Sequence, residues 1–141
     1  QCYNSQIAVD GESRVVVAAD VTQSASDNGQ LIPMLEQVKG ATGRLPQKAL
    51  ADAGYGGEEN LQYLADHGID GYVAQGREGK SGAPPGKPLR AKMARKLKTK
   101  RGQEAYRKRK HIGEPPFGWI KSCLGFRSFS LRGLTKGTGE W

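Results

Sequence analysis

Two acidic residues occupy positions at which a carboxylate could bind a divalent cation. The first, Asp52, lies near the end of a predicted strand, 47–53, and shortly before the glycine-rich run 54–57. In α/β folds functional side chains commonly follow the carboxyl end of a strand, and glycines allow the backbone to approach a ligand closely. An aspartate before such a run is equally typical of a turn or a helix N-cap, so Asp52 alone allows both interpretations.

Glu114 is the second acidic residue, and three other polar side chains are spaced around it at helical intervals. Lys121 follows it by seven residues, nearly two helical turns, so both project from one face of a helix. Tyr106 and Arg109 are three residues apart, about one turn, on the preceding helical stretch. The four side chains could therefore line one groove. Alternatively, Glu114 stabilises a helix N-terminus and the cations are solvated.

Four sequence stretches, YNSQIAVD, VVVAADVT, ALADAGYGG and YRKRKHIGEPPFGWIK, resemble the DDE transposases of bacterial insertion sequences that carry a Tyr-Arg-Glu-Lys signature. In that signature two residues separate Tyr from Arg and six separate Glu from Lys, as they do for Tyr106/Arg109 and Glu114/Lys121. Four residues separate Arg109 from Glu114, whereas the commonest pattern has three. The family's second aspartate lies in a context that the sequence around Asp52 matches. The resemblance covers nearly the whole chain.

The resemblance implies an α/β fold with a ribonuclease-H-like mixed sheet and flanking helices, in which three carboxylates hold two divalent cations, usually Mg²⁺. Asp52 and Glu114 would be two of these catalytic, metal-binding carboxylates. Arg109 and Lys121 would contact DNA phosphates, and Tyr106 would help to position the DNA backbone. Carboxylate oxygens suit Mg²⁺, and two ions about 4 Å apart can activate the attacking oxygen and stabilise the leaving one. The implied parent enzyme cuts element ends, joins them to target DNA, and forms a homo-oligomer on DNA.

The third carboxylate is not evident in the chain. The family's first aspartate lies on the first strand of the fold, and the hairpin that opens this chain corresponds to the second and third strands, so we expect that aspartate to precede Gln1. Asp10 and Asp20 are the early strand-end acids that could replace it, but both positions are more typical of turns or caps. The chain also begins within a predicted strand, and its C-terminal sequence, LTKGTGEW, looks cut within a segment. We therefore expect a fragment, inactive alone, with unpaired backbone where a central strand is missing.

Hydrophobic periodicity predicts the strands and helices that must position these residues. Their order predicts a mixed α/β sheet with helices packed on it. We expect a single domain over 1–141, with a flexible Gly/Pro/Lys-rich insertion at about 76–88. The run 14–20 is apolar on successive residues, which predicts burial on both faces. The expected elements are a hairpin of strands 5–10 and 14–20, a helix from 31 ending at Gly40, a strand at 47–53, a helix closed by Gly68, a strand at 70–75, a long helix at 89–111 broken at Gly102, and, after an interruption at 113–116, a last helix that starts there with Glu114 at its beginning.

Charge divides the chain into two unequal halves. Residues 1–75 carry a net charge of −6, whereas residues 76–141 carry +14 with aromatic residues interleaved among the bases. Lysines and arginines on a folded surface would supply the salt-dependent phosphate contacts of nucleic-acid binding. The alternative is a solvated basic face with no partner.

Other features narrow the class of protein. No run of 18 apolar residues and no basic-then-apolar leader is present, so we expect neither a membrane span nor a signal peptide but a cytoplasmic, nucleoid-associated bacterial protein. Cys2 and Cys123 are far apart and outside any metal-binding spacing, which predicts free thiols, and His67 and His111 are isolated. Two rivals to a transposase stay open: a non-catalytic basic nucleic-acid-binding module, and a metal-dependent nuclease of the same fold that cuts without joining.

Overall fold

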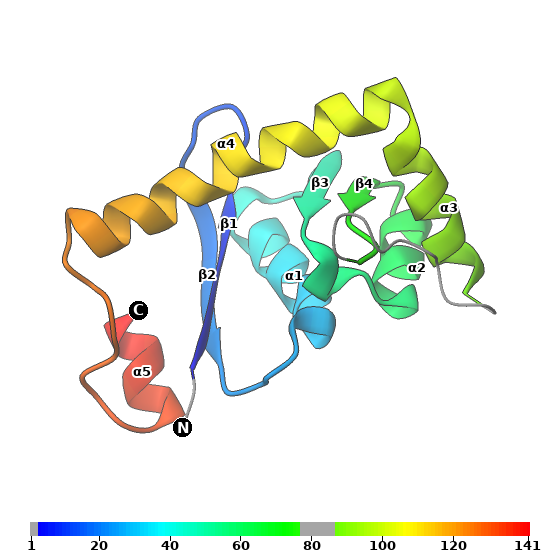
Figure 1. Ribbon diagram of the computed structural model, residues 1–141. Helices are drawn as coiled ribbons and strands as arrows, with labels where there is room; N and C mark the ends of the chain where they lie inside the picture. Colours follow the sequence, from blue (N-terminus) through cyan, green and yellow to red (C-terminus); the bar gives the residue numbers. More distant parts are fainter. Residues whose placement is uncertain (1–2, 77–86) are drawn as a thin grey trace.

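The computed structural model describes residues 3–76 and 87–141, in which two strands come first, helices and strands then alternate, and three helices come last (Figure 1). The predicted insertion at 76–88 falls largely on 77–86, outside the described residues. The elements are β1 (Asn4–Val9), β2 (Val16–Thr22), the 3₁₀ turn η1 (Asp27–Gly29), α1 (Leu31–Thr42), β3 (Lys48–Ala51), the 3₁₀ turn η2 (Ala53–Tyr55), α2 (Glu58–Asp66), β4 (Asp70–Val73), α3 (Pro88–Lys98), α4 (Lys100–Ser122) and α5 (Leu134–Glu140).

The predicted hairpin is confirmed, since β1 and β2 pair antiparallel from Asn4 opposite Thr22 to Val9 opposite Val16. Its turn is organised by Asp10, whose Oδ2 accepts hydrogen bonds from the backbone N–H and the hydroxyl of Ser13, both at 2.7 Å. These bonds, the hydroxyl's first, lower the pKa of Asp10. Asp10 is thus a turn residue, as the sequence favoured.

Burial of β2 on both faces is not observed. Ala18 and Val21 are buried, and Ala18 packs with Met34 and Val38 of α1. Val16 at the start of the strand is 41% exposed, and Ala19 is exposed as well. A run of small and β-branched apolar residues therefore marked a strand correctly but did not report how many of its faces are covered.

α1 buries one face, formed by Leu31, Met34, Leu35 and Val38, as its helical spacing predicts. The predicted end at Gly40 is wrong. The helix continues to Gly43, whose φ of 77° is left-handed and whose N–H donates to the carbonyl of Lys39 at 2.8 Å. A helix stops where a residue adopts this conformation, and Gly43 supplies it.

The second strand pair is parallel. β3 and β4 run side by side from Lys48 opposite Asp70 to Ala51 opposite Val73, with α2 as the connection between them. The larger core cluster lies between these strands and helices α1 and α2; its buried members are Leu31, Leu35, Ala51, Leu61, Leu64, Ile69 and Val73. Among the described residues no strand pairing connects β1 to β3, so the structure has two two-stranded sheets.

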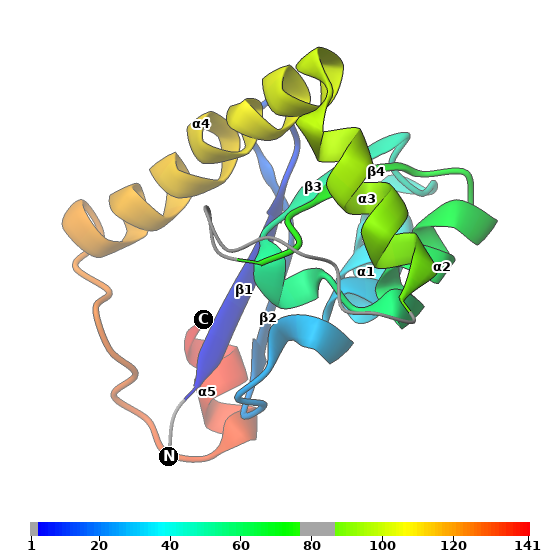
Figure 2. The same ribbon diagram turned by 45° about the vertical axis from the view of Figure 1, so that its right-hand side comes forward.

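Helices α3 and α4 form a tight corner, and α4 packs against β1, β3 and β4 (Figures 1 and 2). The break lies at Thr99 rather than at the predicted Gly102. Thr99 caps α4 by accepting a hydrogen bond from the Gly102 N–H at 3.0 Å. Gly102 is needed for packing, because a Cβ there would overlap the carbonyl oxygen of Lys96.

The predicted interruption at 113–116 is also wrong, since α4 is continuous through Pro115 and Pro116. Pro115 has no N–H to donate to the carbonyl of His111, four residues earlier. That carbonyl instead accepts a hydrogen bond from the guanidinium of Arg14, in the β1–β2 turn. Neighbouring structure thus satisfies the carbonyl that proline leaves open.

The chain ends in a cluster of aromatic rings. Phe126 and Phe129 pack against each other and against Trp141, which follows α5, and Tyr3 packs on Phe129. No helix in the described part of the chain has the length and hydropathy needed to cross a membrane.

Candidate active site

Asp52 follows the carboxyl end of β3 and caps the 3₁₀ turn η2. Its Oδ1 accepts a hydrogen bond from the N–H of Gly54 at 3.0 Å. Its side chain is 50% exposed, so the carboxylate remains accessible to a ligand. The capping and the ligand-binding interpretations of this residue are therefore compatible with each other.

Arg109 approaches this carboxylate from α4. Its Nη1 lies 4.0 Å from Oδ2 of Asp52, and its guanidinium carbon lies 5.4 Å from the ring centroid of Tyr106. The side chain is 28% exposed, and its Nε is buried with no hydrogen-bond partner in the described structure. The structure thus brings together three of the five expected site residues, Asp52, Arg109 and Tyr106.

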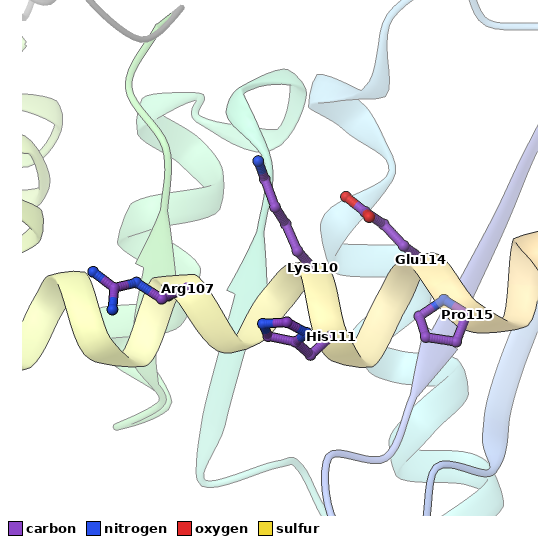
Figure 3. A pocket seen from close by; sticks show the side chains of 5 residues that line it. All are labelled: Arg107, Lys110, His111, Glu114 and Pro115. Carbon is purple, nitrogen blue, oxygen red and sulfur yellow. The ribbon is translucent and has the colours of Figure 1, made fainter.

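Glu114 lies on a different face of α4. It is exposed and lines an open pocket of about 490 Å³ together with Arg107, Lys110, His111 and Pro115 (Figure 3). Glu114 follows Arg109 by five residues of continuous α-helix, which corresponds to a rotation of about 140° between the two side chains. Lys110, four residues before Glu114, extends from the same side of the helix as Glu114. The single groove expected for four side chains is therefore not formed.

Lys121 lies in the last turn of α4 and lines a second pocket, of about 1200 Å³, bordered by the aromatic cluster and by Arg127 and Arg132. By helical spacing it projects within about 20° of Glu114. The expected site residues therefore divide into two sets, one around Asp52 and one, Glu114 and Lys121, on another face of α4.

Sequence reasoning missed Asp27, in η1, which lies beside the Asp52 turn. Its Oδ1 accepts hydrogen bonds from the side-chain amides of Asn4 and, at 3.3 Å, Gln6. Its Oδ2 lies 2.6 Å from the position that a Cβ on Gly54 would take. Burial, and then the negative charges of Asp27 and Asp52, raise the pKa of the Tyr55 phenol.

Glycines and one buried amide hold the turns η1 and η2 together. A Cβ on Gly57 would lie 2.7 Å from Cγ of Asn28, so any other residue at position 57 would displace the Asn28 side chain. Asn60 is 2% exposed, and its Nδ2 donates to the carbonyls of Asn28, at 2.5 Å, and Tyr55, at 2.9 Å. The groups that lie against the glycine run are thus the side chains of Asp27 and Asn28 in η1.

A family model described as the transposase DDE domain matches residues 1–141, the full length of the chain. The chain belongs to the transposase DDE domain family. The resemblance to insertion-sequence DDE transposases predicted from the four motifs is therefore confirmed. No curated protein and no solved structure matches the chain.

The donor atoms around Asp52 in this DDE domain fit a hard divalent cation. Within residues 3–76 and 87–141, no group of three or more His, Cys, Asp and Glu side chains is arranged to hold a metal ion. The polar groups beside the Asp52 turn are instead the carboxylate of Asp27 and the amide of Gln6, whose Nε2 contacts Asp27 and whose buried Oε1 has no hydrogen-bond partner in the described structure. Oxygen donors of this kind suit Mg²⁺, Mn²⁺ or Ca²⁺ rather than softer metals.

The basic half of the DDE domain supplies much of α3 and α4. Some of its cations are already paired: Lys96 lies 2.6 Å from Asp70, and Nε of Arg90 donates to Gln75 at 2.8 Å. Exposed bases remain along α4 on the side of Glu114, where Arg107 and Lys110 line the same pocket. The pocket that Glu114 lines is therefore positively charged on the same side of α4.

Proposed function

We propose that this DDE domain takes part in divalent-cation-dependent cutting and joining of DNA at the ends of an insertion sequence. The observation that carries the proposal is the pairing of Asp52, at the carboxyl end of β3, with Arg109 of α4 at 4.0 Å, in a chain of the transposase DDE family. A carboxylate for a cation and a guanidinium for a phosphate then meet at one place.

We further propose that the two strand pairs belong to one ribonuclease-H-like sheet. In the described residues β1 and β3 each pair on one side only, and Figure 1 shows them between β2 and β4. One strand lying between β1 and β3 would unite an antiparallel pair and a parallel pair into a mixed sheet. Helices α1 and α4 would then flank that sheet.

Asp52 and Glu114 would be carboxylate ligands, but they would share a cation only after a movement of α4, since the structure sets Glu114 on another face of that helix. Mg²⁺ held by them would supply activation of the attacking oxygen and stabilisation of the leaving oxygen at phosphorus. Arg109 would exchange its contact with Asp52 for a DNA phosphate, since a separation of 4.0 Å is longer than a direct hydrogen bond. The ring of Tyr106 supports the guanidinium in that position. Lys121, with the bases near Glu114, would bind phosphates along α4.

The partner in this proposal is DNA, comprising the element ends and the target, bound by a homo-oligomer. Because phosphate contacts release counterions, binding should weaken steeply as the salt concentration rises.

The test uses the transposase expressed from its complete gene and labelled DNA from either side of that gene. Asp52→Asn is expected to abolish strand transfer with Mg²⁺ and to retain DNA binding. The matched control is Asp66→Asn, which changes an exposed carboxylate whose partner is Gln62. Hydrolysis without joined product would identify a nuclease instead. Unchanged function of both Asp52→Asn and Glu114→Gln would identify a non-catalytic binding module.

A further inference from the structure

We propose that Asp27 and Asp52 form one divalent-cation site, with the amide oxygen of Gln6 as a neutral ligand. This inference rests on the proposed function in one respect, the role of Asp52 as a metal ligand. It adds two ligands, Asp27 and Gln6, from segments that precede α1.

The geometry of Gly54 places the two carboxylates together. Asp52 Oδ1 accepts the Gly54 N–H at 3.0 Å, and Asp27 Oδ2 occupies the space where any other residue at this position would have its Cβ. Both carboxylates therefore lie beside Gly54. The buried amide of Asn60 fixes the two turns against each other, so this proximity is part of the fold.

Gln6 supplies an independent indication of a ligand. The residue is 4% exposed, and its Nε2 donates to Oδ1 of Asp27 at 3.3 Å. Its Oε1 is buried and accepts no hydrogen bond in the described structure. The reversed amide orientation would set two oxygens against each other, so Oε1 must be the atom left over. A buried acceptor without a partner is unfavourable, and a bound cation would remove that cost.

The negative charge of the two carboxylates also favours a bound cation. Asn4 and Gln6 both donate to Oδ1 of Asp27, while Oδ2 accepts no hydrogen bond from the described residues. The positive side chain that pairs with either carboxylate in the described structure is Arg109, and it stands 4.0 Å from Asp52. Two carboxylates and an amide oxygen, without thiol or imidazole, make a site for a hard cation such as Mn²⁺ or Mg²⁺.

A competing explanation is that Asp27 serves only as an acceptor that ties η1 to β1. The two explanations differ in what Asp27→Asn does, because an asparagine keeps an oxygen for Asn4 and Gln6 but loses the charge. If Asp27 only ties η1 to β1, Asp27→Asn should leave cation binding unchanged. If Asp27 is a ligand, Asp27→Asn should weaken cation binding while the hydrogen bonds from Asn4 and Gln6 remain.

The experiment measures Mn²⁺ binding to the complete chain by isothermal titration calorimetry, with melting temperatures recorded without metal. Asp27→Asn and Asp52→Asn are each expected to raise the Kd at least about tenfold. Asp66→Asn should leave the Kd unchanged. Gln6→Glu places an anionic oxygen at the same ligand position, so it should tighten Mn²⁺ binding while lowering the metal-free melting temperature through repulsion from Asp27.

The outcomes separate this inference from the proposed function. If Asp52→Asn weakens binding and Asp27→Asn does not, Asp27 is not a ligand and the proposed function stands. If Gln6→Glu folds and does not tighten binding, the amide oxygen of Gln6 is not a ligand. If the unaltered chain does not bind Mn²⁺, or if neither aspartate matters, both the shared site and the role of Asp52 as a metal ligand are overturned.

Discussion

Replacing Gly102 by alanine sets two effects of opposite sign against each other at the α3–α4 corner. Alanine is the better helix former by about 1 kcal/mol, so propensity alone predicts stabilisation. In the structure, however, the new Cβ would overlap the Lys96 carbonyl oxygen and lie 2.9 Å from its carbon and 3.0 Å from Cα of Leu97. These are backbone atoms, so the clash cannot be relieved by a rotamer change. Overpacking of this kind costs about 1–3 kcal/mol and more where backbone must move, so we expect a net loss of about 2 kcal/mol.

The same helix provides a matched control. Gly113 lies in α4 with no atom within 4 Å of the position of its Cβ, so Gly113→Ala should follow propensity and stabilise by about 0.5–1 kcal/mol. Urea denaturation followed by far-UV circular dichroism measures both variants against the unaltered chain. If Gly102→Ala proves as stable as Gly113→Ala, the close approach of α3 and α4 is refuted.

Three further substitutions test other contacts. Asn60→Ala should lower the free energy of unfolding by about 2–4 kcal/mol, because two carbonyls lose a buried donor; a loss below about 0.5 kcal/mol in urea would contradict this. Arg14→Ala should cost about 1 kcal/mol by leaving the His111 carbonyl without its guanidinium donor, and an unchanged urea midpoint would show that water replaces it. Burial alone would raise the pKa of Asp70, but hydrogen bonds and charge, chiefly from Lys96, lower it overall. Its contribution to stability is therefore present above about pH 4 and lost as the pH falls through the lowered pKa, so Asp70→Asn should flatten the acid limb of the stability profile, and an unchanged limb would refute the pairing.

From β1 to β4 the sequence predicted the order and type of the strands and α-helices, because periodicity and glycine placement report on local structure; it did not predict α5. It failed where one segment compensates for another. The run 113–116 has the composition of a helix boundary, yet α4 continues, because Arg14, roughly a hundred residues earlier in the chain, satisfies the carbonyl that Pro115 leaves open. Gly102 similarly looked like a break, although its role is contact with Lys96 across the corner.

The candidate site divides in the same way. Asp52 was recognisable because a strand end and a glycine run are adjacent to it in the sequence. Asp27 was not, because its relation to Asp52 depends on the packing of two turns and on an amide from β1. A polar residue in a polar stretch carries no local mark of such a role. The one indication of Asp27 that the sequence offered is the glycine run 54–57, because such a run can make room for a second loop as well as for a ligand.

The spacing of the Tyr-Arg-Glu-Lys residues has a structural consequence in this DDE domain. With three residues between Arg and Glu, a continuous helix would set the two side chains within about 40° of each other; with four, it separates them by about 140°. Because α4 is unbroken from Lys100 to Ser122, the additional residue turns Glu114 away from the face that carries Arg109 to Asp52. Lys110 takes the place beside Glu114 that the shorter spacing would give to an arginine. If Glu114 and Asp52 bind one cation, α4 must therefore rotate or bend near the consecutive prolines on DNA binding. Hydrogen exchange around residues 109–118, compared with and without DNA, would then change, and an unaltered exchange pattern would exclude that movement.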